Sequence, residues 1–251
     1  MVERQTALVT GGTRGLGRAI AERLLADGYD VAICGRRLPE TPVAAGGREA
    51  VAFAADVRDA AAAEGLIGQV VDHFGGLSLL VNNAGGSPEV SVADSSASLI
   101  EKVIALNLLA PLFLCRAAHA ALTASQGSVV NIASISGRRA APGTVAYGAA
   151  KAGLLNATQG LAMEWAPDVR VNALVVGLVE NPEQAEHYGC ADAMARIGAI
   201  VPMRRMARGS DVAGAVAWLA SPEAAYITGA AIEVHGGGEL PAFLALSQSE
   251  A

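Results

Sequence analysis

Tyr147 and Lys151 are the residues whose types and spacing point most directly to chemistry. They lie four residues apart in the alanine-rich run AYGAAKAGLL (146–155). Residues at this spacing share one face of a helix, so a phenol hydroxyl and an ammonium group converge on one point. A nearby cation favours the phenolate and lowers the pKa of tyrosine from about 10, which suits proton exchange with a carbonyl or alcohol oxygen.

The lysine of this pair is a rare choice. Of the 18 Lys+Arg residues only Lys102 and Lys151 are lysines, and the chain has four tyrosines. Random placement would give on the order of 0.03 Tyr-x3-Lys pairs. Lysine offers a compact charge and a pKa that its surroundings can shift. We therefore predict a tyrosine general acid/base assisted by an ammonium group; the alternative is an exposed pair on an amphipathic helix.

A glycine-rich turn, TGGTRGLG (10–17), follows the first apolar run directly and opens a helical one. Its glycines, Gly11, Gly15 and Gly17, allow a sharp turn and a close approach of backbone N–H groups to a pyrophosphate. A nucleoside-triphosphate loop would continue with Lys and Ser or Thr, whereas Arg18 and Ala19 follow here. We expect a dinucleotide-binding turn, with an ordinary strand–helix turn as the alternative.

The end of the second apolar run indicates which dinucleotide is bound. NAD-binding proteins usually place an acidic residue there to accept a hydrogen bond from the ribose 2′-hydroxyl. This run instead ends in Cys34-Gly35, followed by Arg36 and Arg37, and Arg14 lies within the glycine turn. Guanidinium groups suit a 2′-phosphate in charge and geometry. We predict NADP(H) in preference to NAD(H); the alternative is that these arginines are solvated surface charges.

Short apolar runs alternate with helical runs along the whole chain, which is typical of βαβ units. The predicted strands are 6–11, 30–35, 50–56, 77–85, 127–134, 169–177 and 230–236, and the predicted helices are about 15–27, 60–74, 96–123, 146–165 and 210–220. Segment 36–49 contains two prolines and two glycines and is expected to be a loop with little helix. The pattern predicts an α/β fold, a Rossmann-type doubly wound parallel sheet of about seven strands flanked by helices.

Length and composition exclude several other classes of protein. The 251 residues suit one domain (1–251), within which 178–206 fits neither a strand nor a simple crossover helix and is expected to cover the substrate as a lid. A net charge of −6 argues against nucleic acid or an anionic membrane as partner, and no run of eighteen unbroken apolar residues occurs. Three widely spaced cysteines without a C-x-x-C pair argue against a disulfide framework or a metal site and favour the cytoplasm.

The motifs together resemble the short, single-domain branch of the short-chain dehydrogenase/reductase family, in particular its 3-oxoacyl-[acyl-carrier-protein] reductase-like members. They run almost from end to end: TGGTRGLG at 10–17, DV at 56–57, NNAG at 82–85, Asn107, Ser134 and YGAAK at 147–151. The resemblance implies that the cofactor is lined by Gly11, Thr13, Arg14, Gly15, Leu16, Gly17, Arg36, Arg37, Asp56, Val57, Asn83, Ala84, Gly85, Tyr147, Lys151, Gly177, Val179 and Asn181.

The same resemblance implies four catalytic roles. Tyr147 would be the general acid/base, and Ser134 would hydrogen-bond the substrate oxygen. Lys151 would bond the nicotinamide ribose and lower the tyrosine pKa, and Asn107 would anchor a water that passes protons towards Lys151. A strand-end turn residue is the alternative for Ser134, and a buried amide satisfied by local backbone is the alternative for Asn107.

Two positions depart from the family pattern after the sixth predicted strand. Val176 stands where the family usually has proline, and Asn181 stands where it has a threonine that holds the nicotinamide carboxamide. Gly177 is kept, and an asparagine can both donate and accept hydrogen bonds. We therefore expect nicotinamide binding to survive these changes.

The function implied is an NAD(P)-dependent oxidoreductase. We expect an NADP(H)-dependent reductase of a ketone, such as a β-ketoacyl thioester or a cyclic ketone. The alternatives are an NAD-linked hydroxysteroid or other secondary-alcohol dehydrogenase, and a non-catalytic NADP(H)-sensing or scaffold protein. Arg138, Arg139, Arg204 and Arg205 are candidates to meet an acyl-thioester substrate, and a homotetramer or homodimer is expected, with the apolar tail 236–246 packed against the body or a neighbour.

Overall fold

A seven-stranded parallel sheet forms the centre of the molecule. The structure, a computed structural model, describes residues 5–180 and 191–241. The strands lie in the order β5-β2-β1-β6-β7-β8-β9, and every pair is parallel. They are β1 (Thr6–Thr10), β2 (Asp30–Gly35), β5 (Val51–Ala54), β6 (Leu79–Asn82), β7 (Ser128–Ser134), β8 (Arg170–Val176) and β9 (Ala231–Val234). This confirms the predicted fold class, and the order reverses at β1, where such sheets bind ligands beyond the strands' carboxyl ends.

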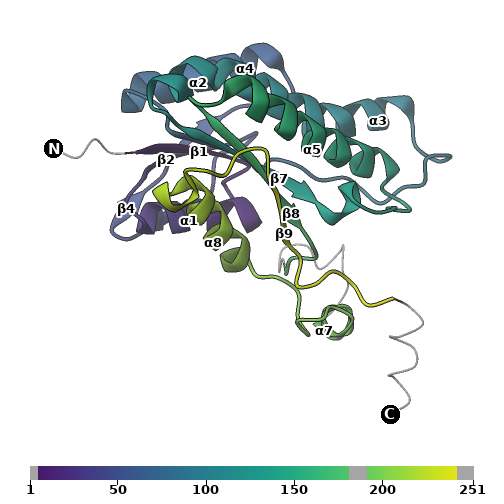
Figure 1. Cartoon of the computed structure of the whole chain (residues 1–251). Coiled ribbons are helices and arrows are strands. Elements are labelled where there is room, and N and C mark those ends of the chain that lie inside the picture. Colours follow the sequence, from purple (N-terminus) through teal and green to yellow (C-terminus); the bar gives the residue numbers. More distant parts are fainter. Residues whose placement is uncertain (1–4, 181–190, 242–251) are drawn as a thin grey trace.

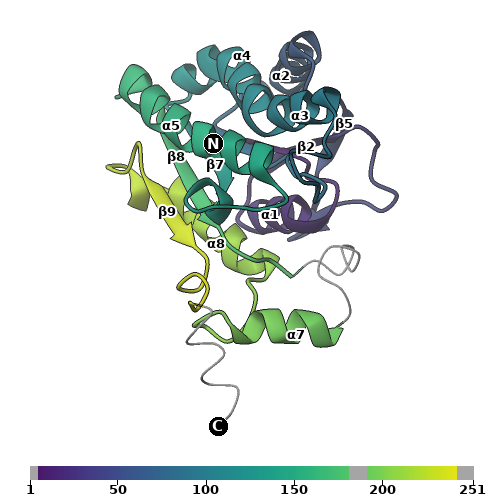
Figure 2. The ribbon, with the colours of Figure 1, turned by 90° about the vertical axis from the view of Figure 1, so that its right-hand side faces the viewer.

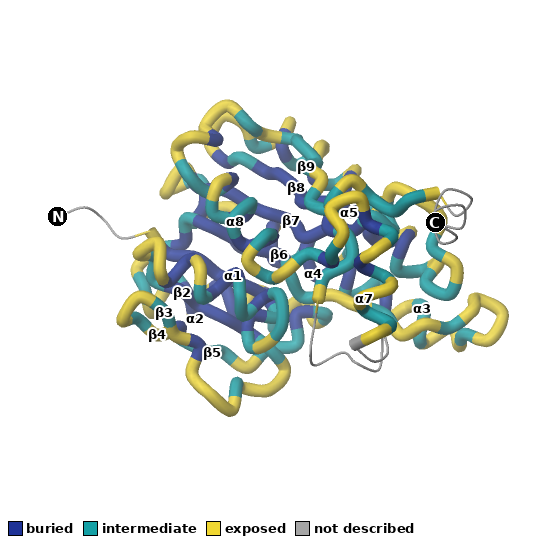
Figure 3. The backbone as a smooth tube through the Cα atoms, turned by 90° about the horizontal axis from the view of Figure 1, so that it is seen from below, coloured by how far each residue is buried: buried dark blue, intermediate teal, exposed yellow. Residues whose placement is uncertain are grey.

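Helices cover both faces of the sheet (Figure 1). One face carries α1 (Gly15–Ala26) and α8 (Gly209–Ala220), as Figure 3 shows from below. The other carries α2 (Ala60–Phe74), α4 (Ala110–Ala124) and α5 (Val145–Trp165). The five predicted helical ranges are thus confirmed, four of them within one or two residues of the observed bounds.

Continuous burial of the strands explains why they read as unbroken apolar runs. All five residues of β1 are buried. Ala7 and Val9 belong to the core that includes residues of α1 and α8, and Leu8 belongs to the core that includes residues of α2 and α4. Successive side chains of a strand point to opposite faces, so a strand covered on both sides needs apolar residues throughout.

The longest helical stretch is interrupted by a π-helical turn. It consists of α3 (Ala97–Ile104), the π turn η1 (Ala105–Leu109) and α4. Ser96 starts it, because its side chain accepts a hydrogen bond from the backbone N–H of Leu99. Among the described residues this stretch is the one candidate membrane span by length and composition. Leu114 and Leu122 of α4 are nevertheless buried in the core of the sheet, which is the position of a core helix.

Several short elements lie outside the predicted pattern. Segment 36–49 has no helix, as predicted, but it contains the hairpin β3 (Ala44–Ala45) and β4 (Arg48–Glu49), whose two turn glycines have φ of 59° and 73°. Segment 178–206 contains α7 (Ala191–Ala199), which stands away from the sheet in Figure 2. Single 3₁₀ turns, η2 (Ile135–Gly137) and η4 (Pro222–Ala224), follow β7 and α8.

Candidate active site

An open cleft of about 1230 Å³ runs along the carboxyl ends of the strands. Its walls come from the glycine turn, the segment after β2, the ends of β6, β7 and β8, and the start of α5. Nearly all the predicted site residues line it: Gly11, Thr13, Arg14, Gly15, Leu16, Gly17, Arg36, Arg37, Asp56, Val57, Asn83, Ala84, Gly85, Ser134, Tyr147, Lys151, Gly177 and Val179. Of the other two, Asn107 lies behind the wall and Asn181 lies outside the described residues.

The glycine turn has the shape that a pyrophosphate needs. Gly11 has a φ of +64°, and a Cβ at Gly17 would lie 2.3 Å from the carbonyl oxygen of Gly11, so α1 can approach β1 this closely only without a side chain. No side chain caps the first turn of α1, which leaves its N–H groups facing the cleft. A helix N-terminus of this kind attracts phosphate oxygens. The turn therefore fits a dinucleotide.

Hydrogen bonds join the residues after β6 to the end of β1 beside this turn. The hydroxyl of Thr10 accepts hydrogen bonds from the backbone N–H groups of Asn83 and Ala84, both at 3.0 Å. The side chain of Asn83 returns a hydrogen bond to the carbonyl of Thr10 at 2.9 Å. These bonds fix the two strands at the switch point, and the bond from the side chain of Asn83 explains an asparagine at this position.

Ser134, Tyr147 and Lys151 converge at the other end of the cleft. Ser134 ends β7, Tyr147 lies in the first turn of α5, and Lys151 follows one turn later. The Nζ of Lys151 donates a hydrogen bond to the carbonyl of Ile132 at 2.8 Å and lies 5.6 Å from the centre of the Tyr147 ring. Two hydroxyl groups, from Ser134 and Tyr147, and the ammonium group of Lys151 therefore lie around one place in the cleft where a substrate oxygen could bind.

Burial controls the acidity of this group. Removal from water raises the pKa of Tyr147, and the hydrogen bond with Ser134 offsets part of that rise. Burial also lowers the pKa of Lys151 to about 8. The expectation of a lowered tyrosine pKa is therefore wrong for the protein without cofactor, because desolvation of the phenolate outweighs the hydrogen bond with Ser134.

Asn107 supports the site from behind. It is fully buried in the π turn, and its side-chain oxygen accepts a hydrogen bond from the N–H of Gly86 at 3.0 Å. Its amide nitrogen donates to the carbonyls of Gly86 and Val103, both at 2.9 Å. A Cβ on Gly85 would lie 2.8 Å from Asn107 Oδ1 and 3.2 Å from Lys151 Nζ. The side chain is thus a buried amide satisfied by backbone, as the alternative for this residue proposed.

The end of the cleft next to β2, which was predicted to hold the adenosine, is rich in arginine. Arg14, Arg36 and Arg37 are exposed and line it, and Cys34 lies at its base, where burial raises the thiol pKa to about 11. Arg58 is among the lining residues that the sequence analysis did not name. It holds Asp56 by two parallel hydrogen bonds of 2.9 and 2.5 Å, which lower the pKa of that carboxyl group. Its position two residues after Asp56 was the signal available.

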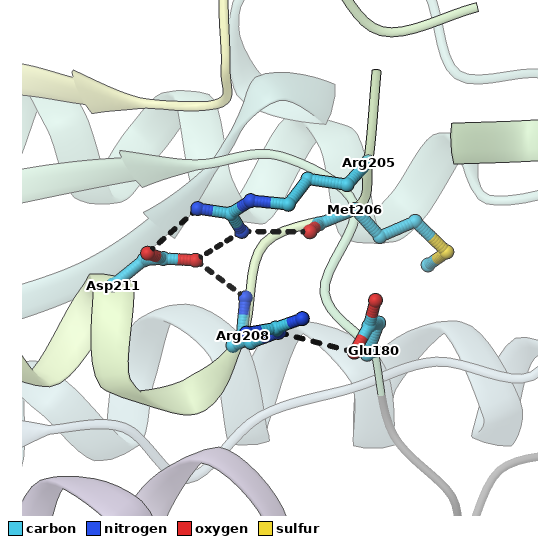
Figure 4. Close-up of polar contacts among 5 residues, drawn as sticks. All are labelled: Glu180, Arg205, Met206, Arg208 and Asp211. Atoms are coloured by element: carbon cyan, nitrogen blue, oxygen red, sulfur yellow. Dashed lines mark hydrogen bonds and ion pairs between the residues drawn. The ribbon is translucent and has the colours of Figure 1, made fainter. Parts of the chain in front are cut away.

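The segment after β8 is pinned to the start of α8 (Figure 4). Backbone hydrogen bonds of 2.8 Å join Glu180 to Ala207 and Ala207 to Leu178. Arg205 binds both carboxylate oxygens of Asp211 at 2.6 and 3.0 Å, and Asp211 also accepts from the N–H of Arg208. The residues that begin and end the segment between β8 and α8 are therefore held next to each other.

The arginines proposed to meet an acyl thioester do not form one free patch. Arg139 forms an ion pair with Glu239, Arg205 is paired with Asp211, and Arg204 donates to the carbonyl of Ala199. The structure therefore gives that interpretation little support. Among the described residues no group of three His, Cys, Asp or Glu side chains is placed to hold a metal ion.

Known proteins resemble the chain over nearly its whole length. A family model described as enoyl-(acyl carrier protein) reductase matches residues 11–239. A Streptomyces violaceoruber protein bearing the name of a ketoacyl reductase of the granaticin polyketide synthase is 37% identical, over 95% of this chain and 97% of its own. The 3beta-hydroxysteroid dehydrogenase 1 of Eggerthella lenta is 35% identical over 93% of each. The structure of a blue fluorescent protein from a metagenomic library, in complex with NADPH, is 32% identical with a TM-score of 0.83 over 93% of this chain and 97% of that one.

Proposed function

The chain belongs to the short-chain dehydrogenase/reductase family of oxidoreductases, and from this premise we propose that it interconverts a ketone and a secondary alcohol with NADP(H). The observation that carries the proposal is the convergence of Ser134, Tyr147 and Lys151 at one end of a cleft that fits a dinucleotide. When bound, the nicotinamide supplies or accepts the hydride.

The protein's own residues supply the proton and the geometry. Tyr147 donates its phenolic proton to the carbonyl oxygen during reduction, while the hydroxyl of Ser134 donates a second hydrogen bond to the same oxygen. Two fixed donors stabilise the negative charge that develops there. Burial raises the pKa of Tyr147, so the phenol holds the proton that reduction of a carbonyl requires.

Lys151 and Asn107 serve the same step from the cofactor side. The ammonium of Lys151, which is buried, would bond the nicotinamide ribose and favour the phenolate after proton donation. Asn107 acts as a positioning residue, because its amide holds Gly86 next to the cofactor-lining Gly85. The water proposed at Asn107 would not accept from its side-chain amide, because both N–H groups already donate to backbone carbonyls.

The substrate proposed is a ketone such as a β-ketoacyl thioester or a cyclic ketone. The name of the Streptomyces violaceoruber relative supports the first, and that of the Eggerthella lenta relative supports a hydroxysteroid or other secondary alcohol as the second candidate. NADP(H) is favoured by Arg14, Arg36 and Arg37 and by the NADPH complex of a related structure. We infer also a single domain (1–251) with a substrate lid at about 178–206, a cytoplasmic location and a homotetramer or homodimer.

Replacement of Tyr147 by phenylalanine tests the proposal. The variant Tyr147→Phe keeps the ring but removes the hydroxyl, so turnover should fall by about a hundredfold to ten-thousandfold, the contribution of a general acid. Cofactor affinity, measured by fluorescence titration, should stay within about twofold. A panel of ketones and acyl thioesters, followed by NADPH absorbance, provides the assay. Undiminished turnover by Tyr147→Phe would refute the assignment.

A further inference from the structure

The outer rim of the adenosine end is a short segment with little support of its own. Residues 36–42, here called the rim segment, connect β2 to the buried Val43 and line the cleft with Arg36 to Thr41. Six of its seven residues are exposed, and Pro39 is half-buried. Apolar packing therefore does not hold the rim segment in place.

Arg18 of α1 supplies the contacts that the rim segment lacks. Its guanidinium donates to the hydroxyl of Thr41 at 3.1 Å, to the carbonyl of Thr41 at 3.5 Å and to the carbonyl of Pro42 at 2.8 Å. Its Nε is held by Glu22 at 2.8 Å, which orients the fork. Within the described part of the chain, no other hydrogen bond joins the rim segment to the rest of the protein.

We propose that Arg18 is a positioning residue for cofactor binding, which fixes the rim segment and with it the arginines that face the adenosine phosphate. The inference rests on the proposed use of NADP(H). Arg36 and Arg37 are the first two residues of the rim segment. Their guanidinium groups can be held in position before the cofactor binds only if the backbone of the segment is itself held in position. A cofactor that binds to an already ordered segment does not have to offset the conformational entropy lost when that segment is ordered. The affinity for the cofactor is therefore higher.

Arginine suits this role for a geometric reason. One planar fork reaches two carbonyls and a hydroxyl at once, which a lysine ammonium on a single stem would do less well. The segment also lacks the regular hydrogen bonds of a helix or strand, so a side chain must replace them. The rim is thus tied to the same helix whose N-terminus faces the pyrophosphate site.

Limited proteolysis tests the anchoring without any ligand. Trypsin cleaves after Arg36 or Arg37 when the rim segment opens, and mass spectrometry identifies the resulting pair of fragments. We expect Arg18→Ala to be cut there about tenfold faster than the unmodified protein, with Arg18→Lys intermediate. Arg23→Ala is the matched control, because Arg23 lies on the same helix in an Arg23–Asp27 pair and does not line the cleft.

Calorimetric titration with adenosine 2′,5′-bisphosphate and adenosine 5′-monophosphate tests the consequence for binding. Arg18→Ala should bind the bisphosphate about tenfold more weakly, and Arg23→Ala should match the unmodified protein. Equal affinity of the unmodified protein for both nucleotides would refute the preference for NADP(H). A loss of affinity in Arg18→Ala for both nucleotides would then still support the role of Arg18. Unchanged cleavage and unchanged affinities in Arg18→Ala would overturn the inference.

Discussion

Among the described residues, Lys151 carries the one charged side chain that is buried. It is buried, its only described hydrogen bond goes to the carbonyl of Ile132, and burial lowers its pKa to about 8. A buried cation without a carboxylate partner destabilises the folded state. Such a residue is retained for function, since a methionine of similar length would pack there without the electrostatic penalty.

A pH-dependent measurement follows from this shift. The unfolded chain binds the Lys151 proton more tightly, so the penalty, roughly 3 kcal/mol for a pKa moved from 10.5 to about 8, applies in full below pH 8. It disappears as the pH rises from about 8 towards 10.5. We expect the stability of the unmodified protein to rise over this range relative to that of Lys151→Met, measured by urea unfolding at each pH.

The other lysine of the chain provides the control. Lys102 is exposed, so Lys102→Met should change the free energy of unfolding by the same small amount at every pH between 7 and 10. Tyr147, whose pKa is raised by burial, is present in both the unmodified protein and Lys151→Met, so its titration enters both curves. Parallel stability curves for the unmodified protein and Lys151→Met would show that the ammonium is not buried.

Residue types and spacing predicted which side chains lie together, but not how burial changes their acidity. Tyr147, Lys151 and Ser134 were chosen from sequence, and the structure brings them together. The direction of the Tyr147 shift was wrong, since the spacing to Lys151 reveals the neighbouring charge but not the depth of burial. The guanidinium contacts of Arg18 were also beyond prediction, because their partners lie 23 and 24 residues away in an irregular segment.

At the scale of elements, a buried polar ladder fixes helix α5 on the sheet. The side chain of Asn82 in β6 donates to that of Asn131 in β7 at 2.8 Å, and Asn131 donates to the hydroxyl of Thr158 in α5 at 2.9 Å. The hydroxyl of Thr158 donates in turn to the carbonyl of Leu154 at 2.8 Å. The ladder sets the position of the helix that carries Tyr147 and Lys151.

Removal of one member of this ladder should destabilise the fold. Thr158→Val keeps the shape but leaves the buried amide of Asn131 without an acceptor, which costs about 1–3 kcal/mol in urea unfolding. Thr158→Ser should recover most of the hydrogen bond. The control is Thr123→Val, because the buried hydroxyl of Thr123 has no partner and its removal should be neutral or stabilising. Equal effects of the two valine variants would contradict the account.

Element prediction succeeded where periodicity was long and failed where it was short. The seven strands of the sheet and five helices follow from apolar runs and helical spacing. The hairpin of β3 and β4 has two residues in each strand, too few to show alternation. The π turn at Asn107 was invisible for a different reason: the apolar pattern continues through it, and only the backbone contacts of Asn107 mark it.

At the scale of the whole molecule, the cofactor cleft joins parts that the chain order keeps apart. Residues from the first helix turn, the rim segment, β6, β7, α5 and the segment after β8 line one cavity. A dinucleotide bound along it would contact all of them only in the folded state. Ligand binding therefore stabilises the whole fold, by about 2.7 kcal/mol at a concentration one hundred times the Kd.

Thermal unfolding in the presence of each dinucleotide measures this coupling. NADPH at one hundred times its Kd should raise the Tm by roughly 5–10 °C, given a domain of this size, and NADH at the same concentration should raise it less. The difference arises because Arg14, Arg36 and Arg37 favour a 2′-phosphate. Reversal of Arg36 and Arg37 to glutamate should remove the advantage of NADPH while leaving the Tm without ligand nearly unchanged, since both side chains are exposed. A larger shift with NADH than with NADPH in the unmodified protein would assign the cleft to the other cofactor.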